Sequence, residues 1–405
     1  MVEGHQRRPH HRRVSPIRAI AAALLAGAVF CAAAQDASLD DLIARAKKRD
    51  AEAEYVLGMK AYEGSGVPRD PGQALRLVER AAKRGHLEAQ NTLGYFMQHG
   101  VGMAANPARA REWYEIAAAR DHARAQVNLG WLHEHGLGTQ RAPALAMEWY
   151  RKAAAQGLVE GEFNAGNLLE TGTGAGPDPA AAAAAYARAA QKDFAPANHR
   201  LGRLLEQKQI PGAVYGDALA RYQTAALAGM PEAQFAAARL LFAGGDPKNA
   251  RGALDWLQRA AKQDYAPARA MLADAASQHR IALQFAAEPA QALAWLRASA
   301  EQGYRDAQLG LAIALEEGRG TARNPADAAT WYAKAAAAGD AEATYRLALL
   351  FDEGIGVARD TVKARDLLGQ AAALGHDRAR ERFNRLLGPG LPDMDGGDFF
   401  KGPRR

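Results

Sequence analysis

Hydrophobic and small residues recur along this chain with a helical spacing that returns after about 36 residues. A central alanine is followed seven residues later by two alanines, or by Ser299-Ala300 in one repeat. Positions i, i+7 and i+8 lie on one face of an α-helix, and small side chains there let neighbouring helices approach closely. We therefore expect these residues to be structural. The central alanines are Ala74, Ala110, Ala146, Ala182, Ala218, Ala253, Ala292, Ala328 and Ala364, at intervals of 36, 36, 36, 36, 35, 39, 36 and 36 residues.

The helix that carries this alanine has predicted start and stop signals. Asp or Asn side chains accept hydrogen bonds from the free N–H groups of a first turn, and proline is tolerated just behind them. The expected caps are Asp70-Pro71, Asn106-Pro107, Asp178-Pro179 and Asn324-Pro325, with Asn249 and Asp360 alone. The expected stops suit a left-handed backbone; they are Gly85, Gly157, Gly229, Gly303, Gly339 and Gly375, or Asp121, Asp193 and Asp264 in the matching place.

A second predicted helix precedes each of these and ends in a Gly-x-Gly turn. It carries Leu-Gly at residues 57–58, 93–94, 129–130 and 201–202. A phosphate-binding loop also uses Gly-x-Gly, but it follows a strand and needs a third glycine or a lysine. The turns are therefore predicted to be structural. Their glycines are Gly64/Gly66, Gly100/Gly102, Gly136/Gly138, Gly172/Gly174, Gly318/Gly320 and Gly354/Gly356.

A repeat such as residues 125–157, with Leu129-Gly130, Gly136-Leu137-Gly138 and Ala153-Ala154, resembles the Sel-one-like repeat, a relative of the tetratricopeptide repeat. The resemblance covers residues 51–376 in nine repeats. It implies an all-α fold, a right-handed α-solenoid of helix-turn-helix repeats, that serves as a scaffold or adaptor, in bacteria often at the cell envelope.

Repeats five to seven depart from this pattern, because they lack the Gly-x-Gly turn. The stretch from Ser277 to Glu288 contains the three extra residues that lengthen one interval from 36 to 39 residues. We expect a longer loop in a degenerate repeat, with a bent superhelix or a dedicated partner contact as the alternatives.

The ends of the repeat array are expected to be capped. Residues 35–50 contain an amphipathic helix from Leu39 to Arg49, and residues 377–387 form a helix that covers the last repeat. Residues 388–405 are rich in Gly, Pro and Asp and are expected to be a disordered tail, in which Phe399-Phe400 is a candidate docking motif.

Residues 1–34 have the features of a secretory signal peptide. A basic leader is followed by an apolar run from Ala19 to Ala33, and Ala32 and Ala34 supply a small-residue cleavage site before Gln35. The run is too short and too rich in alanine for a stable membrane span. We expect a periplasmic or secreted protein after cleavage near Ala34-Gln35.

Removal of this leader changes the charge argument. The leader holds five of the 51 basic and one of the 45 acidic residues, so the net charge falls from +6 to near +2. Nucleic-acid binding thereby loses its compositional support. The single cysteine, Cys31, also lies in the leader, so no disulfide is expected. Hydrophobic residues make up 48% of the chain but aromatic residues only 7%, which favours alanine-rich helices over long strands.

The candidate partner surface is a stripe on the first helices of the repeats. We number each first helix so that position 1 is the residue seven before the glycine of its Leu-Gly pair. Positions 2, 6, 9 and 13 then share one helical face, which should line a concave groove. In repeat two the stripe is Glu88, Thr92, Tyr95 and His99, and in repeat three Arg124, Asn128, Trp131 and His135. Later repeats add Arg200, Arg203, Arg239 and Arg346.

Aromatic and arginine side chains are enriched at interface hot spots, so we predict that a protein partner binds this stripe, with the chain itself a monomer. The alternative is that Tyr95 and Trp131 pack against a neighbouring helix. The tryptophans of the second helices are expected in the core; they are Trp113, Trp149, Trp256, Trp295 and Trp331.

Catalytic motifs are missing from the sequence. No serine has a lysine three places later, as serine β-lactamase chemistry needs, although some Sel-one-like proteins have been described as β-lactam-hydrolysing. His133 and His135 are two residues apart and point to different helix faces, so we expect no metal site, a packed His133 and a solvated His135. No cofactor is expected. A carbohydrate-directed or cell-wall factor or hydrolase, including a β-lactamase-like one, is the alternative to a scaffold.

Overall fold

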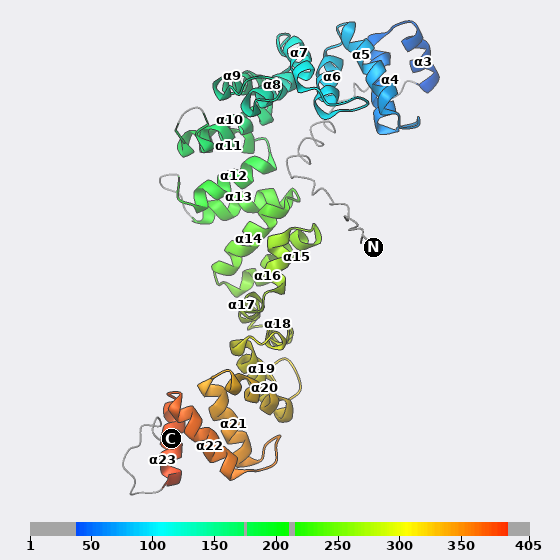
Figure 1. Ribbon diagram of the computed structural model, residues 1–405. Helices are drawn as coiled ribbons and strands as arrows, with labels where there is room; N and C mark the ends of the chain where they lie inside the picture. Colours follow the sequence, from blue (N-terminus) through cyan, green and yellow to red (C-terminus); the bar gives the residue numbers. More distant parts are fainter. Residues whose placement is uncertain (1–37, 174–175, 210–214, 388–405) are drawn as a thin grey trace, which may run out of the picture. The chain divides into compact units, whose positions relative to one another are not determined.

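Short helices follow one another through all the residues that the computed structural model describes, which are 38–173, 176–209 and 215–387 (Figure 1). No β-strand occurs within these ranges. The expected leader, its cleavage site, and the tail with Phe399-Phe400 lie outside the described residues. The chain divides into an N-terminal part, Met1–Asp178, and a C-terminal part, Pro179–Arg405.

The N-terminal part holds an isolated helix and then three helix pairs and the first helix of a fourth. Consecutive helices pack against one another all along this part. The helices are α3 (Leu39–Lys47), α4 (Ala51–Glu63), α5 (Pro71–Lys83), α6 (Leu87–His99), α7 (Pro107–Ala118), α8 (Ala123–His135), α9 (Pro143–Ala155) and α10 (Val159–Thr171).

The C-terminal part continues the same arrangement and also contains a short 3₁₀-helix, η1 (Pro247–Asn249). The α-helices are α11 (Pro179–Ala190), α12 (Ala195–Glu206), α13 (Tyr215–Leu227), α14 (Pro231–Ala243), α15 (Ala250–Lys262), α16 (Ala266–Ala273), α17 (Ala275–Gln284), α18 (Pro289–Glu301), α19 (Arg305–Glu317), α20 (Pro325–Ala337), α21 (Ala341–Glu353), α22 (Thr361–Ala373) and α23 (Asp377–Leu387). The predicted all-α fold of helix-turn-helix repeats is confirmed.

The predicted start and stop residues define most of the helix ends. Asp70 Oδ1 accepts from the N–H of Gln73 at 2.9 Å, and Asn106, Asn324 and Asp360 cap in the same way. Every described glycine or aspartate expected to end a second helix has a positive φ, from 56° at Asp193 to 91° at Gly375. The prediction for Asn249 is wrong, because Asn249 makes no side-chain cap. Asp246 caps η1 just before it instead.

A buried tyrosine on the second helix fills the space between the two helices of a repeat. Tyr114, Tyr150, Tyr186, Tyr222 and Tyr332 are at most 2% exposed. The rings of three of them lie against the Leu-Gly glycine of the first helix, where a Cβ would stand 2.6–3.0 Å from a ring carbon. The recurrent glycine is therefore required by the close approach of this ring.

The tryptophans of the second helices are not fully in the core, which corrects the prediction. Each is half-buried, because it directly precedes the position of the buried tyrosine and so points about 100° away from it. Two of the indole rings make cation–π contacts with lysine side chains. Lys152 Nζ lies 4.1 Å from the centroid of the Trp149 ring, and Lys334 Nζ lies 3.7 Å from that of the Trp331 ring.

The first helix of repeat seven is broken into α16 and α17. The break is at Asp274, whose Oδ2 accepts from the N–H of Ser277 at 2.8 Å and starts the new helix. Most of the stretch from Ser277 to Glu288 is therefore helical, and not the longer loop that we expected. Phe285, only 1% exposed, anchors its end in a local apolar cluster.

The two outer helices pack like members of additional repeats. Leu42 of α3 is 1% exposed and occupies the position that Val78 and Tyr114 hold 36 and 72 residues later. At the other end, Phe383 of α23 lies against Gly369 of α22. Helix α3 ends at Lys47, two residues before the predicted end, and Arg49 takes the left-handed backbone with φ 66°.

Candidate protein-binding surface

The predicted stripe is only partly accessible, because its first two positions are largely used by the fold. Thr92 is 2% exposed, and its hydroxyl lies 3.5 Å from the Tyr55 hydroxyl. Glu88 lies 3.0 Å from His122 Nε2 of the next repeat. That hydrogen bond lowers the pKa of Glu88. Thr92 is therefore not available to a partner, and the Glu88 carboxylate is held in place.

The more accessible stripe positions of the N-terminal part lie toward the ends of α6 and α8. Tyr95 and Trp131 are half-buried and pack against the hydrophobic core with one side. Both interpretations of these rings thus hold in part, since each ring has a packed face and an exposed face. Burial raises the pKa of Tyr95.

Each of these rings is paired with a histidine one turn further on. The centroids of Tyr95 and His99 are 4.3 Å apart and those of Trp131 and His135 are 4.5 Å apart. His99 and His135 are exposed, and His135 Nδ1 lies 3.0 Å from the carbonyl oxygen of Trp131. We call Tyr95, His99, Trp131 and His135 the aromatic stripe.

Asn128 connects the two helices that carry this stripe. Its Nδ2 donates to Asn91 Oδ1 at 2.9 Å, from α8 to α6. The amide is half-buried, so its first role is to hold the two helices in register.

The predicted arginines lie in the C-terminal part, on α12, α14 and α21. Arg200 and Arg203 of α12 are half-buried and Arg239 of α14 is exposed. Arg239 makes an ion pair with Glu206, whose other oxygen accepts from the Tyr222 hydroxyl at 2.9 Å. Arg346 is likewise engaged, with Glu342 and Glu316. The ion pairs of Arg239 with Glu206 and of Arg346 with Glu316 therefore join successive repeats.

Neither a metal cluster nor a membrane-spanning helix is found in the described residues. His133 is 7% exposed while His135 is exposed, so the prediction of one packed and one solvated histidine is confirmed. Burial lowers the pKa of His133, with Glu115 opposing and Arg111 adding to the effect.

Sequence reasoning missed three histidines that join successive repeats. His86, His122 and His376 each cap a first helix, with Nδ1 accepting a backbone N–H at 3.0–3.1 Å. Nε2 then carries the proton and faces a glutamate of the preceding repeat at 2.7–3.0 Å. The signal was present as a histidine 34 residues after a glutamate in each case, but histidine is not among the usual capping residues.

This geometry is that of a helix-turn-helix repeat scaffold, in which small residues and a buried tyrosine build the framework. A family model for the Sel1 repeat matches residues 51–86, 87–122, 123–158, 159–194, 231–265, 286–304, 305–340 and 341–376. The chain belongs to the Sel1 repeat family, whose repeats are suited to binding proteins. The match omits predicted repeat five and the first half of repeat seven, which are among the repeats that lack the Gly-x-Gly turn.

Solved structures resemble the chain as well. The protective antigen c5321 of uropathogenic Escherichia coli, with an SLR fold, is 26% identical over 89% of this chain and 85% of that chain, with a TM-score of 0.38. A Sel1 repeat protein from Oxalobacter formigenes is 28% identical over 55% of this chain and 87% of that chain, with a TM-score of 0.49. The immunity protein Pa5087 of Pseudomonas aeruginosa is 22% identical over 46% and 68%, with a TM-score of 0.34. No curated protein matches the chain.

Proposed function

We propose that this protein is an exported scaffold that binds a protein partner through the first helices of its repeats, in regulation or assembly at the cell envelope. The observation that carries the proposal is the aromatic stripe. It presents two large half-buried rings, each in contact with an exposed imidazole.

The space between the two helices of each repeat is filled by other side chains. Tyr114 and Tyr150 already occupy the space inside repeats two and three, and the position of Tyr95 and Trp131 is held by Asn167 in repeat four. A position that accepts asparagine is not specified by packing alone. Tyrosine and tryptophan supply large contact areas at a small cost in side-chain entropy, and both are enriched at the centres of protein interfaces.

Export is supported by the composition of the leader and by the absence of cysteine from the rest of the chain. The test is the N-terminus of the protein recovered from intact cells. Mass spectrometry should find a chain that begins at Gln35 in the periplasmic or secreted fraction. A protein that begins at Met1 and stays in the cytoplasm would contradict export.

The binding proposal is tested by site-specific photo-crosslinking in intact cells. A photoreactive residue at His135, in the aromatic stripe, should give a discrete crosslinked protein. The matched control is Ile116 on α7, which is 44% exposed and lies outside the stripe. The same crosslink from Ile116, or none from His135, would argue against a partner on the stripe.

A further inference from the structure

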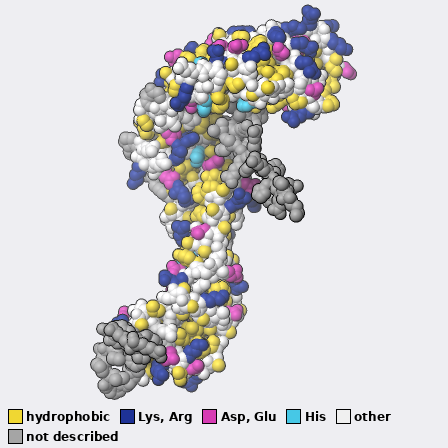
Figure 2. Space-filling view, viewed as in Figure 1, with side chains coloured by type: hydrophobic (Ala, Val, Ile, Leu, Met, Phe, Trp, Pro, Cys, Tyr) yellow, Lys and Arg dark blue, Asp and Glu magenta, His cyan; other side chains and the backbone are white. Residues whose placement is uncertain are grey.

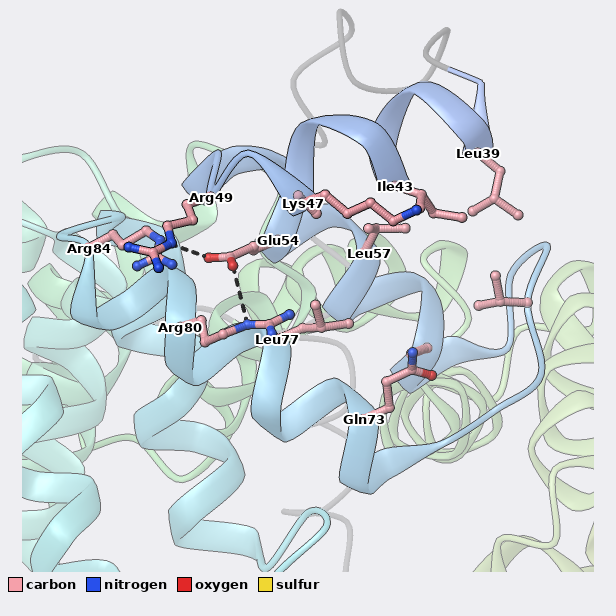
Figure 3. A pocket seen from close by; sticks show the side chains of 13 residues that line it. Leu39, Ile43, Lys47, Arg49, Glu54, Leu57, Gln73, Leu77, Arg80 and Arg84 are labelled. Carbon is pink, nitrogen blue, oxygen red and sulfur yellow. Dashed lines mark ion pairs between the residues drawn. The ribbon is translucent and has the colours of Figure 1, made fainter.

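An open pocket of about 730 Å³ lies between α3, α4 and α5 in the N-terminal part (Figure 3). We call it the cap pocket. Its apolar lining is supplied by all three helices, and Ile43 remains 37% exposed there. The volume falls within the range of natural ligand sites. The apolar lining residues are Leu39, Ile43, Ala46, Leu57, Ala61, Val67 and Leu77.

The repeat pattern explains why this pocket exists. Leu77 stands where Trp113 and Trp149 stand 36 and 72 residues later, and in those repeats the half-buried indole packs against the hydrophobic core. Leucine is smaller than tryptophan, and α3 is only nine residues long, against 13 for α5. The cap pocket therefore lies beside a position at which the next two repeats carry the larger tryptophan side chain.

Cations surround the cap pocket. Lys47, Arg49, Arg80 and Arg84 line it together with a single carboxylate, Glu54. Glu54 is 1% exposed and lies 3.2 Å from both Arg80 and Arg84, as the dashed lines in Figure 3 show. Figure 2 shows lysine and arginine side chains gathered over this end of the N-terminal part.

Two of these cations are left for a ligand. Arg80 and Arg84 neutralise the buried Glu54, whereas Lys47 and Arg49 are exposed and make no ion pair with any described residue. The site thus combines an unfilled apolar space with uncompensated positive charge at its edge. An occupant that matches both properties carries a large apolar side chain beside carboxylates.

We propose that the cap pocket binds an acidic protein segment, which inserts an aromatic side chain beside Leu77, the position that Trp113 and Trp149 hold in the next two repeats. The adjacent carboxylates of that segment face Lys47 and Arg49. This proposal does not rest on the aromatic stripe. The pocket uses positions 4, 7 and 11 of α4, namely Glu54, Leu57 and Ala61, which lie on the helix face opposite stripe positions 2, 6, 9 and 13.

Residues 391–401 of this chain supply a defined probe with the required chemistry, since Asp393, Asp395 and Asp398 stand close to Phe399 and Phe400. A labelled peptide of this sequence is titrated with the full chain, in which Phe399→Ala and Phe400→Ala prevent competition by its own copy. Fluorescence anisotropy should show saturable binding that weakens as salt is raised. The same peptide with both phenylalanines changed to alanine should bind at least about tenfold more weakly.

Two variants test the location of the site. Leu77→Trp fills the pocket with the residue found at the same place in repeats two and three, and should weaken peptide binding about tenfold or more. Arg49→Gly removes an edge charge and installs the residue found at Gly85 and Gly157; it should weaken binding less and reduce the salt dependence. If Leu77→Trp unfolds the protein, Arg49→Gly still decides the question.

The proposal is overturned if the peptide does not bind, or if it binds both variants as tightly as the parent chain. It is also overturned if Tyr95→Asn with Trp131→Asn abolishes peptide binding, since the site would then be the aromatic stripe. Unchanged peptide binding to that stripe variant supports a separate pocket, whatever the outcome for the partner of the stripe.

Discussion

The ring of Tyr114 lies so close to the backbone of Gly94 that a Cβ on residue 94 would stand 2.6 Å from Tyr114 Cε1. The same relationship joins Gly130 to Tyr150 and Gly202 to Tyr222. Each tyrosine hydroxyl then donates to a side chain near the end of the first helix, as from Tyr150 to Glu134 at 2.7 Å. The glycine, the ring and the terminal acceptor together fix how the two helices of a repeat cross.

Gly94→Ala should destabilise the protein, because the added methyl group has no space beside the Tyr114 ring. Overpacking of this kind costs about 1–3 kcal/mol of unfolding free energy. Urea denaturation followed by circular dichroism measures it. Gly252→Ala is the matched control, since Gly252 is also helical but nothing lies within 4 Å of its Cβ position. The control should stabilise by about 0.5–1 kcal/mol, and equal losses at both sites would refute the packing explanation.

His122→Ala should lower stability by about 1 kcal/mol, because the side chain caps α8 through the N–H of Ala125. His122→Asn restores a capping acceptor but not the contact with Glu88, so it should recover most of this loss. If asparagine recovered nothing, the contact with Glu88 rather than the cap would carry the effect.

The protein should lose stability as the pH falls below about 6.5, the ordinary pKa of histidine. Burial lowers the pKa of His133 and of His279, so the unfolded chain binds protons that the folded chain does not. Their contribution is therefore complete above the unfolded pKa and is lost as the pH drops through and below it. His133→Leu, which copies Leu169 of repeat four, should reduce the difference in unfolding free energy between pH 7.5 and 5.5. An unchanged pH dependence would show that His133 is not responsible.

Arg49→Gly should raise the melting temperature slightly. Arg49 holds φ 66°, while the equivalent residues Gly85 and Gly157 hold 86° and 85°. A left-handed backbone costs a non-glycine residue about 1–2 kcal/mol, which the greater freedom of glycine in the unfolded chain partly offsets. Arg49→Val should destabilise instead. A gain from valine would mean that the backbone at this position is not strained.

The sequence predicts helix ends far better than it predicts the surface. Glycine, aspartate and proline act locally, so Gly85 and Asp70 could be assigned from the chain alone. The prediction that Asn249 caps a helix was wrong because Asp246, three residues earlier, caps the 3₁₀-helix that precedes α15. The tryptophans were misplaced because two adjacent aromatic residues, such as Trp149 and Tyr150, cannot both face the core, and only the structure shows that the tyrosine does.

The accessible part of the stripe could be predicted only in outline. Helical spacing placed Thr92 and Tyr95 on one face of the helix. How much of that face is buried by the neighbouring repeat depends on the angle at which the helices cross. Glu88 and Arg239 were correctly placed near the surface, yet their ion pairs with His122 and Glu206 join helices from different repeats. Such contacts have no local sequence signature beyond a matched spacing.

The central question for this protein is whether the aromatic stripe binds the partner that crosslinks at His135. The decisive measurement is the affinity of that partner for two variants of the protein. The first is Tyr95→Asn with Trp131→Asn, which introduces the residue found at the same position in repeat four, Asn167. The second is the control Trp149→Ala on a second helix, which introduces the residue found at the same position in repeat four, Ala185. Loss of the exposed rings should weaken binding at least about tenfold, while Trp149→Ala binds like the parent and both variants stay folded. Equal affinity for the two variants would contradict a partner site on the stripe.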